Sequence, residues 1–496
     1  MQSRAIGWIA FCGLGLVFGF VLVLFRGEPI VASDQGVFLS VAARMLDGDR
    51  LYAEVVDNKD PLFFYTYAAA LAVGGWRGPF LLDGVWLGLA GIAIALLARE
   101  LHAPRSAVIT SFFVYPFALT AGWYGAGLSM LGALAVAPLA PWLWLRGRFA
   151  ASGLHVAVAM LLKINLFPLV VAPLCALVVM GIPPHARWRG LVRGASGMVA
   201  GLVVAAVLLA LRGELRAYIE TIGNNIHYST ALTKSSGTLG RIVDHFRVAF
   251  DFFHLAGRWQ LPAALLVLGC FAAASVVAWV RGGRWERAIS AVGVATLVGG
   301  FVVLGLTAYW NEHLQLLAYP ATFIALALIA VVAVTVGSRA GAALALLVVA
   351  FAAWSSLRNP GGLEVSSVWT STPISAGAIA LERAHERLYP DEQHIPYMVF
   401  GSNSENGHAA FISDEFDLAC RWFQLYPFSP SQEFGETLDC AKQKRPRLVL
   451  VTLGFFETRP DGTPWAAFVS RTRRFLNERY ELVETEPPGF QVWNRR

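Results

Sequence analysis

The sequence predicts a mainly α-helical protein that crosses a membrane many times and ends in a small α/β domain. Hydrophobic residues make up 56% of the chain and charged residues only 15%. Uncharged runs such as Gly127–Leu145 and Leu314–Gly337 can span a hydrocarbon layer of about 30 Å at about 1.5 Å per helical residue. The net charge of +6 lies in short clusters between apolar runs, which does not indicate a nucleic-acid partner.

Basic residues set the expected topology, because short loops rich in Lys and Arg stay on the cytoplasmic side. Placing each such loop there gives about eleven spans, near residues 6–25, 80–98, 106–121, 126–145, 149–163, 166–181, 195–211, 261–280, 288–308, 314–336 and 340–356. The N-terminus is then cytoplasmic, and the membrane is expected to be a bacterial-type inner or plasma membrane. The loops concerned carry Arg4, Arg99 with Arg105, Arg146 with Arg148, Arg187 with Arg189 and Arg193, Arg281 with Arg284 and Arg287, and Arg339.

Residues Phe149–Met180 are expected to form two short passes rather than one long helix. One helix would put the basic loops at its two ends on opposite sides of the membrane. A turn at "LLKINLFP" keeps both loops on one side, and Pro168 fits a helix break there. Lys163 and Asn165 would then lie near the outer membrane face.

The expected domain boundary lies near residue 357, where charges become frequent. Residues 1–356 form the transmembrane module, with outer loops at 26–79 and 212–260, and residues 357–496 form a soluble extracytoplasmic α/β domain. Cys420 and Cys440 can pair as a disulfide if this domain is exported, although the sequence does not require it. Strands are expected at "PYMVFG", "RLVLVTL", "YELVET" and "GFQVWNR", and helices at "ISAGAIALERAHERL" and "FVSRTRRFLNERY".

The first outer loop carries the most suggestive chemistry, in "SDQGVFLSVAARMLDGDRLYAEVVDNKDPLFFY". Asp34 precedes "GVFLSVAARML", whose amphipathic spacing predicts a helix lying along the membrane surface. A carboxylate held in such a partly desolvated place has a raised pKa and can act as a general base. The alternative is structural, with Ser33 or Asp34 capping the helix.

Taken with the following "WRGPFLLDGVWLGLAGIAIALLARELH", this region resembles the N-terminal part of the GT-C glycosyltransferases. The likeness is to the branch that contains protein O-mannosyltransferases and the lipid A aminoarabinose transferase. It is detailed over residues 30–105 and continues in "LLKINLFP", in "EHLQLLAYP" and in the C-terminal domain. Two positions depart from the family pattern: Asp34-Gln35 stands for a usual Asp-Glu, and Lys59-Asp60-Pro61 stands for "KPP".

The resemblance implies an enzyme that transfers a sugar from a polyprenyl-phosphate donor to an acceptor hydroxyl of a lipid, glycan or protein. Asp34 would be the general base, since the attacking hydroxyl must lose a proton. Lys163 would contact the phosphate, because fixed cations stabilise its developing charge; its alternative is a lysine that snorkels to the interface. The remaining candidates to line the site or position its parts are Asp57, Lys59, Arg241 and His313.

No cofactor is implied by the sequence. The phosphate-binding pattern G-x-x-x-x-G-K-[ST] does not occur, and adjacent Glu312 and His313 lack the i, i+4 spacing of a zinc helix. Gln35 in place of a second carboxylate leaves a divalent metal unsupported.

Two other functions compete with the transferase. A transporter or flippase for lipid-linked glycans would show paired halves and charges near the membrane midplane, which the sequence lacks. An O-antigen ligase or polymerase would share an outward site and depend on a large, late outer loop with arginines, which residues 212–260 fit only loosely.

Overall fold

The computed structural model describes residues 2–26, 34–121, 129–183, 187–233, 240, 260–306, 315–357, 376–401, 416–420, 431–456, 463–486 and 489–496. The chain separates into two compact units. The first comprises residues 1–28, 80–205 and 235–366. The second comprises residues 29–79, 206–234 and 367–496, so most of the first predicted outer loop and the first half of the second group with the C-terminal residues.

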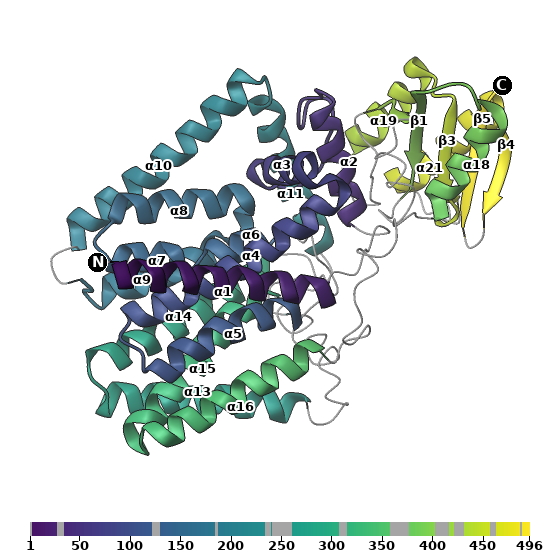
Figure 1. The fold of residues 1–496 in the computed structure, drawn as a ribbon. Helices are drawn as coiled ribbons and strands as arrows, with labels where there is room; N and C mark the ends of the chain where they lie inside the picture. Colours follow the sequence, from purple (N-terminus) through teal and green to yellow (C-terminus); the bar gives the residue numbers. More distant parts are fainter. Residues whose placement is uncertain are drawn as a thin grey trace. The chain divides into compact units, whose positions relative to one another are not determined.

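Apolar helices build the first unit, and a helix lies at each of the eleven predicted spans (Figure 1). Among the described residues, five helical stretches are long and apolar enough to cross a membrane, which makes this an integral membrane protein. The count of eleven crossings stays a prediction. The helices are α1 (Gln2–Arg26), α4 (Gly78–Glu100), α5 (Arg105–Ala121), α6 (Leu131–Val136), α7 (Leu139–Leu145), α8 (Phe149–Leu162), α9 (Phe167–Val179), α10 (Arg187–Leu211), α13 (Gln260–Arg281), α14 (Arg284–Leu306), α15 (Ala318–Thr335) and α16 (Ser338–Leu357).

Glycines bring α1 and α4 into close contact. Gly15 and Gly19 on α1 are spaced as G-x-x-x-G, and so are Gly84 and Gly88 on α4. A Cβ atom on Gly19 would lie 2.1 Å from the carbonyl oxygen of Gly84. Small residues at this spacing let two membrane helices approach backbone to backbone, and dispersion contacts then hold the pair together.

The chain turns back between α8 and α9, as the sequence predicts. The indole Nε1 of Trp144, just before α8, donates to the carbonyl of Ile182, just after α9, at 2.9 Å. Arg284 Nη2, at the start of α14, donates to the neighbouring carbonyl of Gly181 at 3.1 Å. Because both ends of the α8–α9 pair lie at one end of the unit, Lys163 at the turn lies at the other, roughly 20 Å away along α8.

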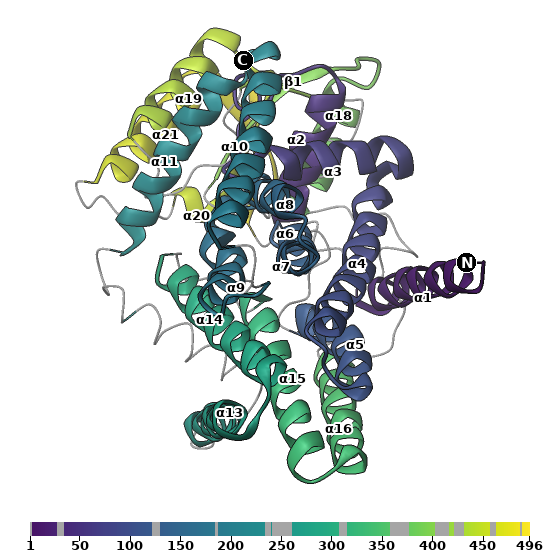
Figure 2. The ribbon, with the colours of Figure 1, turned by 90° about the vertical axis from the view of Figure 1, so that its left-hand side faces the viewer.

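The predicted cytoplasmic loops gather at this same end of the first unit. Arg146 Nη1 lies 3.6 Å from Glu100 Oε2, which joins the loop after α7 to the end of α4. His102 stacks on Trp285 with ring centroids 4.2 Å apart, which adds the start of α14. From there α14 and α15 run side by side (Figure 2). The structure therefore groups the arginine-rich loops as the positive-inside rule requires, while the side of the membrane they face stays a prediction.

The second unit begins with α2 (Asp34–Leu46) and α3 (Pro61–Gly74). The predicted helix after Asp34 is confirmed, but its expected position along a lipid surface is wrong. Val37, Phe38 and Val41 are at most 1% exposed within the protein, and Phe38 packs edge-on against Phe63 with centroids 4.8 Å apart. Aromatic side chains of α3 supply the apolar surroundings that the bilayer was expected to supply.

The second outer loop also contains a helix that the sequence did not predict. α11 (Leu215–Thr233) follows α10 after a corner at residues 212–214 and continues the second unit. Apart from residue 240 and Gln260, where α13 begins, the remainder of that loop lies outside the described residues.

The C-terminal domain is an α/β fold, as predicted. Its described strands form one sheet in the order β2-β1-β3-β5-β4, with β1, β2 and β3 parallel and β5 antiparallel to both neighbours. The short strand β2 and the helices α19 and α20 were not predicted from the sequence. The elements are α18 (Ala376–Leu388), β1 (Ile395–Phe400), β2 (Phe416–Leu418), α19 (Ser431–Lys444), β3 (Leu448–Thr452), α20 (Leu453–Phe456), α21 (Pro464–Arg479), β4 (Tyr480–Glu486) and β5 (Phe490–Arg495).

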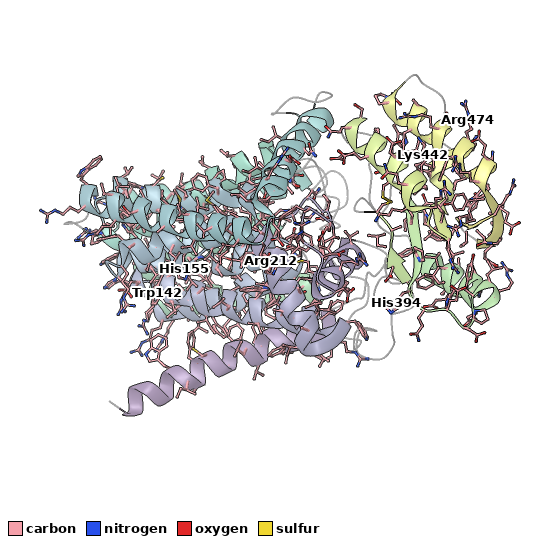
Figure 3. All side chains as sticks on the ribbon, turned by 90° about the horizontal axis from the view of Figure 1, so that it is seen from above. Trp142, His155, Arg212, His394, Lys442 and Arg474 are labelled. Atoms are coloured by element: carbon pink, nitrogen blue, oxygen red, sulfur yellow. A yellow bond between two sulfur atoms is a disulfide. The ribbon has the colours of Figure 1, made fainter. Side chains whose placement is uncertain are left out.

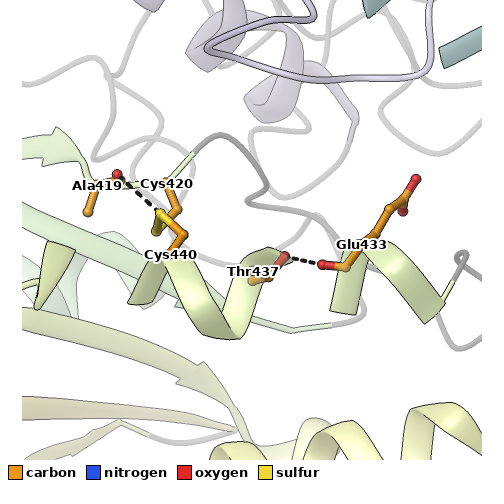
Figure 4. Close-up of a disulfide and its surroundings, with 5 residues drawn as sticks. All are labelled: Ala419, Cys420, Glu433, Thr437 and Cys440. Carbon is orange, nitrogen blue, oxygen red and sulfur yellow. Dashed lines mark hydrogen bonds between the residues drawn. A yellow bond between two sulfur atoms is a disulfide. The ribbon is translucent and has the colours of Figure 1, made fainter. Parts of the chain in front are cut away.

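Successive side chains of a strand point to opposite faces of the sheet, so this domain has two hydrophobic cores, one on each face. Tyr397 and Val399 point to the face covered by α18, in a hydrophobic cluster that also contains residues of α2 and α3. Met398 and Phe400 point to the opposite face, which α19 and α21 cover. Cys440 on α19 forms a disulfide with Cys420 beyond β2, with Cα atoms 6.0 Å apart (Figure 4). The pairing left open by the sequence is therefore present.

Candidate functional site

The Asp57–Pro61 turn in the first outer loop is the centre of the candidate site. The backbone N–H of Lys59 donates to Asp57 Oδ1 at 3.0 Å, so Asp57 shapes the turn. Lys59 Nζ donates to Asn58 Oδ1 at 2.6 Å. Pro61 opens α3, where its fixed φ and missing N–H suit the first helical position. The departure from the family pattern at Asp60 therefore falls at the N-cap of α3.

Helix α11 holds this turn through two side chains. Tyr218 donates its hydroxyl to Asp60 Oδ1 at 2.8 Å, and Asp60 is only 6% exposed. Asn225, two turns further along α11, donates through Nδ2 to the carbonyl of Asn58 at 2.8 Å. A carboxylate this deeply buried needs such donors, because burial without hydrogen bonds is costly.

Tyr52 completes the support from within the loop itself. Its hydroxyl donates to the carbonyl of Lys59 at 2.7 Å, and its ring lies 5.0 Å from that of Tyr218. Burial, reinforced by the negative charge of Asp60, raises the pKa of Tyr52 well above its ordinary value. The pKa of Tyr218 is raised for the same reasons, so both phenols stay neutral donors.

Glu214 anchors α11 at its first turn. The carboxylate is fully buried and accepts hydrogen bonds from the backbone N–H of Leu51 at 3.1 Å and from Nε of Arg212 at 2.9 Å. Tyr65 on α3 donates its hydroxyl to the second carboxylate oxygen. Arg212 lies at the corner between α10 and α11 (Figure 3). One carboxylate thus ties this corner to Leu51 and to Tyr65 in the first loop.

The structure brings Asp34 and Lys59 to the same part of the second unit. Asp34 is the first residue of α2, four residues before Phe38 in the same helix. Lys59 Nζ lies 5.3 Å from the centroid of the Phe38 ring. The roles of Asp34 as a base and of Lys59 as a phosphate contact stay predictions.

Lys163 belongs to the first unit, at the turn between α8 and α9. Its backbone is extended there, with φ −161° and ψ 97°, which ends α8 before the short helix η2 (Ile164–Leu166) begins. The half-buried side chain donates from Nζ to Ser129 Oγ at 3.0 Å. Lys163 therefore lies at the end of the unit opposite the arginine-rich loops, as the sequence predicts.

Two candidates, Arg241 and His313, lie outside the described residues. Within the described part of the chain, no group of three or more His, Cys, Asp or Glu side chains is placed to hold a metal ion.

The sequence did not identify the α11 residues as part of the site, because residues 212–260 were expected to form a loop. A signal was present: Glu214, Tyr218, Thr221 and Asn225 recur at intervals of four, three and four, which is the spacing of one helix face.

No protein-family model matches the sequence, and no curated protein matches it. A solved structure of ArnT from Cupriavidus metallidurans bound to undecaprenyl phosphate matches with a TM-score of 0.53 at 13% identity, covering 99% of this chain and 98% of that chain. Apo ArnT from the same organism gives a TM-score of 0.39 at 14% identity, over the same shares. Arabinofuranosyltransferase AftD from Mycobacteria gives 0.43 at 13% identity, covering 98% of this chain and 40% of that chain. The fold implied by the resemblance to the GT-C branch of the aminoarabinose transferase is confirmed by the first of these.

Proposed function

We propose that this protein is a membrane glycosyltransferase that moves a sugar from a polyprenyl-phosphate donor to an acceptor hydroxyl on the outer side of the membrane. The observation that carries the proposal is the likeness over almost the whole of both chains to ArnT, which was solved with undecaprenyl phosphate bound. The hydrogen-bonded turn around Lys59, close to the start of α2, supports it from the chain's own residues.

In this reaction the acceptor oxygen attacks the anomeric carbon from the face opposite the phosphate. The bond between that carbon and the phosphate oxygen breaks, and the polyprenyl phosphate leaves with the electron pair, so the sugar is inverted. Asp34 takes the proton of the acceptor hydroxyl as general base. The leaving phosphate gains negative charge, which fixed cations stabilise.

Two lysines are assigned to that phosphate. Lys163 is the first choice, because a cation at the end of a short apolar helix is costly unless it has a task. Lys59 is the second, because its turn is rigidly supported. The acceptor is a hydroxyl of a lipid, glycan or protein.

The deciding experiment replaces the proposed base. Asp34→Asn keeps the size of the side chain but cannot take a proton, so we expect transfer to be lost, by about 10²-fold or more. In a deletion strain, the wild-type gene should clear an accumulated polyprenyl-phosphate sugar from the lipid extract, and the variant should not. Purified Asp34→Asn protein should still bind undecaprenyl phosphate as the wild type does.

Asp47→Asn is the matched control, because Asp47 is an exposed carboxylate in the turn directly after the C-terminal end of the same helix. It should restore wild-type lipid profiles. Full activity of Asp34→Asn, or equal loss in both variants, would remove Asp34 as the base.

A further inference from the structure

We propose that α11 is the strut that fixes the Asp57–Pro61 turn, with Tyr218 and Asn225 as positioning residues for Lys59. The inference rests on the proposed function only where it assigns Lys59 to the phosphate of the donor. The placement of Lys59 by α11 is argued only from contacts within the second unit.

The geometry of α11 suits this task. Tyr218 lies four residues after Glu214, and Asn225 lies seven residues after Tyr218, so all three are on one face of the helix. Glu214 fixes the first turn of that face to Leu51 and Tyr65 of the first loop. Tyr218 and Asn225, on the same face, then contact the turn itself.

Every residue from 57 to 60 has a defined hydrogen bond in the turn. Asp57 accepts from the N–H of Lys59, the carbonyl of Asn58 accepts from Asn225, the carbonyl of Lys59 accepts from Tyr52, and Asp60 accepts from Tyr218. Lys59 is therefore flanked on both sides by residues that α11 holds. A fixed backbone removes the conformational freedom of the turn in advance, so that binding a phosphate would have to order only the side chain of Lys59.

The strut also reaches the C-terminal domain. Asn224, the neighbour of Asn225, donates through Nδ2 to Glu433 Oε1 on α19 at 2.8 Å. Glu433 is 7% exposed, so this contact is shielded from water. Adjacent residues of α11 thus hold the turn and the C-terminal domain, which gives that domain a part in supporting the site.

The first test measures how firmly Lys59 is held, without any substrate. Purified full-length protein in detergent is treated with an amine-acetylating reagent, and the rate at Lys59 is read by peptide mass spectrometry. Tyr218→Phe removes one hydroxyl, and Asn225→Ala removes one amide, and each should accelerate labelling of Lys59 about fivefold, as expected for loss of one hydrogen bond.

Tyr389→Phe is the matched control. Its hydroxyl donates to Asn494 Oδ1 at 2.6 Å within the C-terminal domain, so it loses the same kind of bond away from the turn. Lys442, whose side chain is exposed on the outer face of α19, serves as the internal reference and should keep its rate in all variants. Unchanged labelling of Lys59 in both Tyr218→Phe and Asn225→Ala would overturn the inference.

The second test asks whether Tyr218 acts through Lys59. Undecaprenyl phosphate is titrated against the wild type, Tyr218→Phe, Lys59→Ala and the double variant. We expect Tyr218→Phe to raise the Kd about fivefold in the wild-type background. In the Lys59→Ala background it should add nothing, because the residue it positions is gone.

Equal effects of Tyr218→Phe in both backgrounds would show a merely structural role and overturn the inference. If the wild type does not bind undecaprenyl phosphate at all, the proposed function fails, and the labelling rate of Lys59 still decides the role of α11.

Discussion

Glu214 shows how a single buried carboxylate can connect distant parts of this chain. Its partner Leu51 is 163 residues away in sequence, and Tyr65 is 149 residues away. The oxygens are fully buried, so the hydrogen bonds that they accept replace the water they have lost. Glu220, one turn and a half further along α11, forms only an exposed pair with Arg216.

These two glutamates give a matched prediction. Glu214→Ala leaves the Tyr65 hydroxyl and the Leu51 N–H without their acceptor, so the free energy of unfolding should fall by about 2–4 kcal/mol. Glu220→Ala should change it by no measurable amount, because exposed ion pairs contribute little. Thermal unfolding of both variants in the same detergent checks this. Equal melting temperatures would show that Glu214 does not anchor α11.

At the scale of elements, helices meet in this protein by two different means. In the first unit, α1 and α4 approach through glycines, because lipid offers no hydrophobic drive between apolar helices. In the second unit, α2 is buried among aromatic side chains of α3, and α11 is fixed by hydrogen bonds. The contact in the first unit depends on small residues, and the contacts in the second unit depend on aromatic and polar residues, so the two units respond to different substitutions.

Two glycines of α1 test the close contact between α1 and α4. Gly19→Ala puts a methyl group 2.1 Å from the carbonyl oxygen of Gly84, and neither backbone can yield cheaply, so the melting temperature should fall. Gly13 has nothing within 4 Å of an added Cβ, so Gly13→Ala should stabilise the helix by up to about 1 kcal/mol. Thermal unfolding in detergent compares them. A stabilising Gly19→Ala would contradict the close contact.

At the scale of the whole molecule, the disulfide bears on which side of the membrane the C-terminal domain occupies. Disulfides persist in oxidising compartments and are rare in the cytosol, so the Cys420–Cys440 bond supports export of this domain. The grouping of the arginine-rich loops at one end of the first unit supports the same orientation.

Thiol labelling on intact cells tests this orientation. In a variant whose Cys12, Cys175 and Cys270 are replaced by alanine, a membrane-impermeant maleimide should label the protein only after an impermeant reductant has been added. Adding Cys420→Ser to that variant frees Cys440, which should then label without reduction. Labelling that appears only after the membrane is permeabilised would place the domain in the cytoplasm.

The sequence by itself determined the properties that repeat over short distances. Uncharged runs located the membrane helices, Pro168 marked the helix break near Lys163, and short runs rich in β-branched and aromatic residues located four strands of the C-terminal sheet. These features depend on whether a side chain is more stable in water or in an apolar environment. A short stretch of neighbouring residues is enough to show that pattern. Only the tertiary structure decided that α2 is buried in protein, that Cys420 meets Cys440, and that Tyr218 and Asn225 hold the turn around Lys59. The contacts from α11 join residues that lie more than 150 positions apart, so no local pattern could contain them.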